Sequence, residues 1–146
     1  MNIKKIILVG SIAEVAAFLV GNLLYLNPLA ASLYSASAAV YCSKPMGLFG
    51  GVMPWLLLMF AGGIVSSILL SFLYSFTEKG LDIRPSWKKG VCFGFIFWLV
   101  SGLPMAYNTW LLHSYPDAMV VVEAFNGLVG ALVAGTVIGI AYERIK

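Results

Sequence analysis

Four long apolar stretches, separated by short polar segments, dominate the pattern of hydrophobic and polar positions along the chain. They cover residues 3–26, 53–76, 91–112 and 119–142. Because an α-helix rises about 1.5 Å per residue, about 20 residues cross a hydrocarbon core of about 30 Å. The pattern therefore predicts an all-α integral membrane protein, a four-helix bundle in which residues 1–146 form a single transmembrane domain.

The composition agrees with lipid as the surrounding solvent. The sequence has 146 residues, of which 61% are hydrophobic and 10% are charged, whereas an ordinary soluble domain has about 25% charged residues. No metal-ligand spacing, cofactor motif, nucleic-acid-binding pattern or nucleophile–base set occurs in it. We therefore expect a lipid bilayer as the main partner, and neither an enzyme, a cofactor, a metal nor a nucleic acid.

Lysine and arginine residues gather on one side of this topology. Eight of the nine lie near the two termini or in residues 78–89, and only Lys44 lies on the other side. By the positive-inside rule, both termini are predicted to be cytoplasmic, in an inner or cytoplasmic membrane.

Small residues recur at four-residue spacing within the apolar stretches, so they stack along one face of each predicted helix. Such ridges let membrane helices approach closely. The two halves of the chain also form a weak parallel repeat of two helical hairpins, although the same spacing is common in any membrane bundle. The predicted packing residues are Ala17, Gly21, Gly63, Ser67, Ser71, Gly127, Ala131, Gly135 and Gly139.

The first outer loop, residues 27–52, is much longer than the second. Asn27 can cap a helix and Pro28 suits its first turn. We expect a short amphipathic helix on the outer surface of the membrane, which is either functional or a lid over the bundle. Its apolar side would hold Leu29, Leu33, Val40 and Tyr41.

Glu14 is the most unusual residue, because it lies near the middle of the first apolar stretch. A charge there costs at least about 2.5 kcal/mol, and no Lys or Arg lies deep enough to balance it. Glu14 is therefore either a proton or cation site, or a neutral acid that joins helices through hydrogen bonds. Its candidate partners are Ser66, Ser67, Asn108 and backbone carbonyl groups.

Three features of the second half could shape an outer cavity. Pro104 removes one helical hydrogen bond, so it should kink the third helix and free the Val100 carbonyl. Tyr107 and Asn108 follow it and could line such a cavity. Glu123 lies near the outer end of the last helix, where it is either part of the cavity or a solvated acid.

Two groups of residues resemble known membrane proteins. Ala13-Glu14-Val15 resembles a tripeptide in the first helix of the four-helix small multidrug transporters, and this resemblance implies a Glu that binds protons and drugs. It covers these three residues only. A second set is similar to a loose group of four-span membrane proteins with no known activity, and it implies the fold alone. This set comprises Lys89-Gly90, Phe93-Gly94, Trp98-Leu99, Pro104 and a small-residue helix ending at Tyr142.

The leading functional hypothesis is an accessory or structural subunit that packs against a larger membrane complex or against copies of itself, because small-residue ridges are so abundant. The alternative is a small oligomeric proton- or cation-coupled transporter or channel that uses Glu14. Ridges that face outward would favour the first hypothesis, and a Glu14 that faces a wet cavity would favour the second.

Overall fold

The computed structural model describes residues 2–25, 28–39, 44 and 46–145, and all regular structure in these ranges is helical. Four helices are long and apolar enough to cross a membrane. The elements are α1 (Ile3–Tyr25), α2 (Pro28–Ala39), the 3₁₀ helix η1 (Met46–Phe49), α3 (Val52–Thr77), α4 (Ser86–Phe97), the π-helix η2 (Trp98–Gly102), α5 (Leu103–Leu112) and α6 (Asp117–Arg144).

The third membrane-spanning helix, which is formed by α4, η2 and α5, covers Ser86–Leu112. It begins earlier than residue 91, where the apolar stretch begins. Pro85 occupies the N-cap position of α4, where its missing N–H costs little. The helix therefore begins at Ser86, directly after this proline, and its first turn is formed by residues that precede the apolar stretch.

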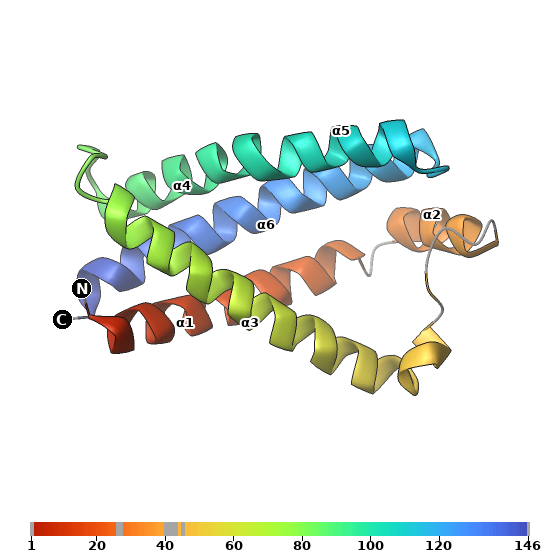
Figure 1. Cartoon of the computed structure of the whole chain (residues 1–146), viewed down its shortest axis with the longest axis horizontal. Coiled ribbons are helices and arrows are strands. Elements are labelled where there is room, and N and C mark those ends of the chain that lie inside the picture. Colours follow the sequence, from red (N-terminus) through yellow and green to blue (C-terminus); the bar gives the residue numbers. More distant parts are fainter. Residues whose placement is uncertain (1, 26–27, 40–43, 45, 146) are drawn as a thin grey trace.

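The helices pack in the order α3, α1, α6, α4. Helix α6 packs along both α1 and α4, and α3 packs along α1. Figure 1 shows α3 crossing α1 and then diverging from the other long helices toward its N-terminus, while α4, η2 and α5 follow α6. The two halves of the chain are therefore joined mainly by α1 and α6.

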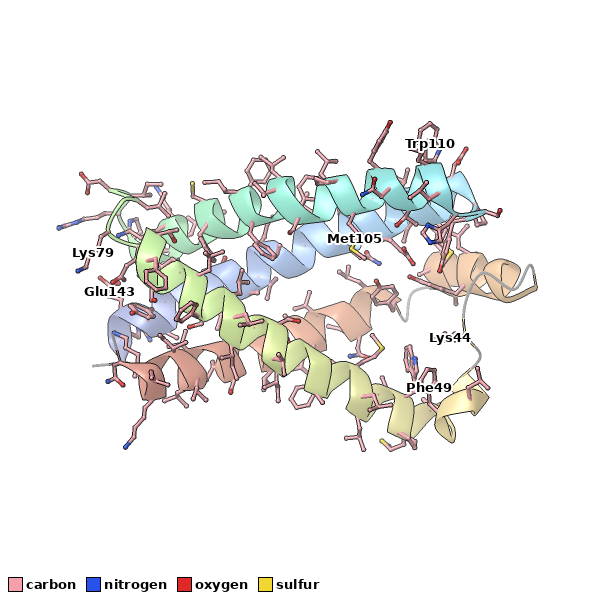
Figure 2. All side chains as sticks on the ribbon, viewed as in Figure 1. Lys44, Phe49, Lys79, Met105, Trp110 and Glu143 are labelled. Atoms are coloured by element: carbon pink, nitrogen blue, oxygen red, sulfur yellow. The ribbon has the colours of Figure 1, made fainter. Side chains whose placement is uncertain are left out.

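The two ends of this arrangement differ in their number of Lys and Arg residues, most of which lie near the termini or in residues 78–89. Lys79 and Glu143 lie at one end, with both termini, and Lys44 and Trp110 lie at the other (Figure 2). We call the end with the termini the basic end. The buried core lies toward this end, where the ring of Tyr74 is 2% exposed and packs edge-on against Phe93. The core residues are Val9, Ala13, Leu70, Tyr74, Phe93, Ala134 and Ile138.

Glycines set the close approach of α4 to α6. A Cβ atom on Gly90 would overlap the carbonyl oxygen of Gly135, and one on Gly94 would overlap that of Ala131. A Cβ atom on Gly139 would lie 2.6 Å from the carbonyl oxygen of Ser86. Most of the predicted ridge of the last helix is thus filled by α4 of the same chain.

The π-helix lies directly before Pro104. Because Pro104 has no N–H, the Val100 carbonyl loses its α-helical donor. In η2 the backbone N–H of Leu103 donates to the carbonyl oxygen of Trp98, five residues back. Such π-helical turns relieve a locally interrupted hydrogen-bond pattern and are frequent at functional sites.

The first loop contains the expected helix, α2. Its packed side includes Ala30, which is 1% exposed, whereas Leu29 is 65% exposed. Asn27, Val40 and Tyr41 lie outside the described residues.

Two glycines form the turn into α3. Gly50 and Gly51 have φ angles of 85° and 112°, which glycine adopts without strain.

Candidate functional site

Glu14 is enclosed between α1 and α3. Its side chain is 7% exposed, and the hydroxyl of Ser67 donates a hydrogen bond of 2.8 Å to its Oε2 atom. The other candidate partners are placed elsewhere: the Ser66 hydroxyl donates to the carbonyl oxygen of Gly62, and Asn108 is exposed. Ser67 is therefore the side chain that joins Glu14 to another helix.

Two glycines create the space for this carboxyl group. A Cβ atom on Gly10 would lie 2.5 Å from the Cα of Ile68, so α1 and α3 are nearly in backbone contact there. A Cβ atom on Gly63 would overlap Oε1 of Glu14. The carboxyl group thus fills the position of a missing side chain, and it can act chemically as a hydrogen-bonded link between the helices.

Two buried polar atoms in the described part of the chain have no hydrogen-bond partner. They are Oγ of Ser71, which is fully buried one turn after Ser67, and Nδ2 of Asn126. Sequence spacing singled out Ser71 as a packing residue, which suits its small size. Its hydroxyl does not stabilise the fold, because an unpaired buried polar group costs free energy.

The predicted ridge residues do not share one environment. Ala17 packs against the core. A Cβ atom on Gly127 would lie 3.7 Å from Nε1 of Trp98, and a Cβ atom on Gly21 would meet nothing within 4 Å. On α3, Gly62 precedes the packed Gly63, and a Cβ atom on Gly62 would likewise meet nothing within 4 Å. The part of α3 before Ser67 contains no buried residue.

A cavity of about 330 Å³ lies between α1, the π-helix, α5 and α6, toward the end opposite the basic end. Glu123 lines it and accepts a hydrogen bond of 3.2 Å from the hydroxyl of Tyr34. Burial, followed by the influence of Tyr25 and Glu123, raises the pKa of Tyr34 above its ordinary value. Tyr34 therefore remains a hydrogen-bond donor through the neutral pH range.

The π-helix shapes one wall of this cavity. Nε1 of Trp98 donates a hydrogen bond of 3.1 Å to the carbonyl oxygen of Ala124, and a Cβ atom on Gly102 would lie 2.5 Å from the Trp98 ring. Tyr107 lines a separate cavity of about 420 Å³ on the other side of α5. Asn108 lines neither cavity.

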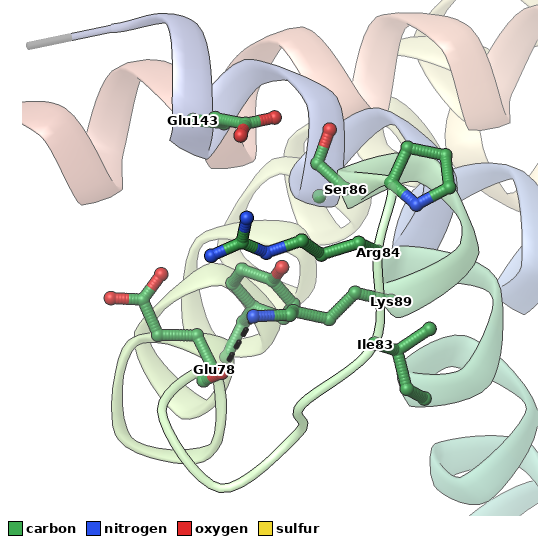
Figure 3. Close-up of a pocket in the computed structure, with 9 residues that line it drawn as sticks. Glu78, Ile83, Arg84, Ser86, Lys89 and Glu143 are labelled. Carbon is green, nitrogen blue, oxygen red and sulfur yellow. Dashed lines mark hydrogen bonds between the residues drawn. The ribbon is translucent and has the colours of Figure 1, made fainter.

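A larger cavity of about 780 Å³ lies at the basic end (Figure 3). We call it the basic-end cavity. It is formed by the end of α3, the α3–α4 loop, the start of α4 and the end of α6. Sequence reasoning did not identify it, although the charges of residues 78–89 were noted as an orientation signal. Its lining residues are Tyr74, Glu78, Ile83, Arg84, Pro85, Ser86, Lys89, Gly139 and Glu143.

Comparisons with known proteins find no matching family model, no similar curated protein and no similar solved structure.

Proposed function

We propose that this protein is a structural or accessory subunit that associates within the membrane with another protein or with a second copy of itself. The observation that carries this proposal is the outward face of α3 in its first half and middle. We call this the Gly62 face, and it comprises Leu58, Gly62, Val65, Ser66 and Leu69.

The residues of the Gly62 face lie on one side of α3, because they are spaced by three or four positions. Leu58, Val65 and Leu69 are about 60% exposed, at 59%, 59% and 61%, and nothing lies within 4 Å of a Cβ atom on Gly62. Gly62 and Ser66 form a pair of small residues four positions apart. Such a pair allows close approach of another membrane helix.

The polar atoms of this face are suited to contact with an apolar partner. The hydroxyl of Ser66 donates a 3.0 Å hydrogen bond to the carbonyl oxygen of Gly62, within the same helix. Neither group therefore needs water, and the surface presented to a partner is small and largely apolar. Close backbone packing would supply the attraction, because lipid offers no hydrophobic driving force between helices.

The alternative, a small oligomeric proton- or cation-coupled transporter or channel that uses Glu14, has less support. Exchange of a proton or cation requires access to water, whereas the Glu14 side chain is 7% exposed. Its contacts with Ser67 and Gly63 suit a structural link between helices.

Site-specific photo-crosslinking in the native membrane tests the proposal. A photoreactive amino acid would replace Val65 or Leu69 on the Gly62 face, or Val100 as a control. Val100 is 74% exposed on a different helix. We expect a discrete protein adduct from Val65 and Leu69 but not from Val100.

Mass spectrometry of the adduct would identify a second copy or a different protein. If the Val65 and Leu69 probes gave only lipid adducts, as expected of Val100, the proposal would be wrong.

A further inference from the structure

The basic-end cavity presents charges of both signs that are not paired with one another. It is lined by Arg84 and Lys89, and by Glu78 and Glu143. No ion pair with N···O within 4.0 Å joins these side chains in the part of the chain that the structure describes. We propose that the cavity binds a phosphodiester that carries a primary ammonium group, the chemistry of a phosphoethanolamine headgroup. This site is independent of the Gly62 face.

Arg84, Ser86 and Lys89 provide donors for the phosphate. A guanidinium and an ammonium are strong partners for phosphate oxygens. Nζ of Lys89 donates one hydrogen bond of 3.0 Å to the carbonyl oxygen of Glu78, so two of its N–H donors remain. Ser86 begins α4 and offers its hydroxyl and its backbone N–H, whereas the backbone N–H groups of Lys88 and Lys89 already donate to the carbonyl oxygen of Pro85.

Glu78 and Glu143 provide acceptors for the ammonium group. Glu78 is the C-cap residue that follows α3, and Glu143 lies in the last turn of α6. Figure 3 shows the Arg84 and Lys89 side chains extending toward the side of the cavity where these two carboxylates lie. A ligand placed among them can therefore meet both signs of charge at once.

The charge balance favours a dipolar ligand over a simple anion. Two cationic and two anionic side chains line the cavity, so their formal charges cancel. A bare phosphate would be attracted by the cations and repelled by the carboxylates. A phosphodiester with an ammonium group carries one charge of each sign, and each has a partner of opposite sign here.

The position of the cavity suits a membrane phospholipid. It lies at the basic end, where the α3–α4 loop joins two membrane-spanning helices. Trp87, beside the lining residue Ser86, is 46% exposed, as is common at the level of lipid headgroups. A separate cavity of about 390 Å³, lined by Leu81, Phe97 and Val100 among others, borders the same loop and could take an acyl chain.

Native mass spectrometry of the full-length protein in detergent tests this proposal. The protein would be exposed to an equimolar mixture of phosphatidylethanolamine, phosphatidylglycerol and phosphatidylcholine. We expect about tenfold more phosphatidylethanolamine than either other lipid to remain bound, because one charge-assisted hydrogen bond contributes on that order. Equal retention of the three lipids, or a preference for phosphatidylglycerol, would overturn the proposal.

Two variants separate the roles of the charges. Arg84→Gln should lower retention of all three lipids about tenfold, since each contains the phosphate. Glu143→Gln should remove the preference for phosphatidylethanolamine and increase phosphatidylglycerol, because an ammonium acceptor and a source of repulsion are lost. Lys88→Gln is the matched control, since Lys88 is exposed and does not line the cavity. Wild-type selectivity in Glu143→Gln would contradict the proposal.

A soluble headgroup distinguishes a membrane lipid from a free metabolite. Glycerophosphoethanolamine would be added to the complex with phosphatidylethanolamine. Displacement at millimolar concentration would support the site and show that the headgroup chemistry alone is recognised, as for a free phosphodiester. Retention of the lipid would support the site with a membrane phospholipid as its ligand, held also by its acyl chains.

Discussion

At the scale of single residues, two serines on α3 have opposite hydrogen-bonding environments. Ser67 donates to the carboxyl group of Glu14, and Ser71, one turn later, is buried with an unpaired hydroxyl. The two side chains are identical in size, and both are buried on the inner face of α3. Their comparison therefore separates hydrogen bonding from packing in the α1–α3 contact.

We predict that Ser67→Ala lowers the free energy of unfolding by about 1 kcal/mol, because Glu14 loses its partner. Ser71→Ala should leave this free energy unchanged or raise it, because it removes an unpaired buried hydroxyl. Glu14→Gln should keep most of the stability, since an amide still accepts the hydrogen bond from Ser67.

Thermal unfolding in detergent, followed by circular dichroism, measures all three variants. Equal losses in the two serine variants would show that packing, rather than the Glu14 hydrogen bond, decides the stability of this contact.

At the scale of helices, the glycines of α6 differ in what surrounds them. Gly135 touches the backbone of α4, whereas nothing lies within 4 Å of a Cβ atom on Gly130. Gly135 belongs to the four-residue spacing of small residues in this helix, whereas Gly130 does not.

We predict that Gly135→Ala destabilises the protein by about 1–3 kcal/mol, because the added methyl group forces α4 and α6 apart. Gly130→Ala is the matched control on the same helix, and it should have no effect or a stabilising effect of up to about 1 kcal/mol. Chemical denaturation monitored by tryptophan fluorescence would check the difference. Equal stability of the two variants would mean that close packing at Gly135 is dispensable.

The sequence was sufficient to predict the four long helices, because each apolar stretch is longer than a soluble core helix requires. Residue spacing marked Gly63, Ser67 and Ser71 as packing residues, but it could not show whether they face a helix of this chain or another protein. Gly62 and Gly63 are adjacent, as are Ser66 and Ser67, so two neighbouring faces show the same four-residue spacing. The contact of Gly63 with Glu14 and the burial of Ser67 and Ser71 identify the inner face, and this places the Gly62 face outside.

The basic-end cavity was beyond sequence reasoning for a different reason. Its charged residues come from the C-cap of α3, the α3–α4 loop, α4 and α6, and Glu78 and Glu143 are far apart in the chain. Residue spacing relates side chains within one helix, but it does not say which helix ends meet. Glu123 was recognised as a possible cavity residue, while its hydrogen bond with Tyr34 depends on the placement of α2.

At the scale of the whole molecule, the packing is uneven between the two ends. Tyr74 and Phe93 close the bundle near the basic end, whereas the first half of α3 contains no buried residue. The small residues of α4 and α6 contact each other's backbone, whereas Gly62 contacts no other helix of the chain. This asymmetry is the structural basis for proposing a partner inside the membrane.

The most direct test of this proposal is gentle detergent extraction of the tagged protein from its native membrane, followed by size analysis and mass spectrometry of everything that co-purifies. We predict a particle that contains more than one copy of the chain or a second membrane protein in fixed ratio, and that dissociates when Gly62→Leu fills the Gly62 face. A single copy of the chain, recovered across mild detergents without any stoichiometric partner, would contradict the proposal.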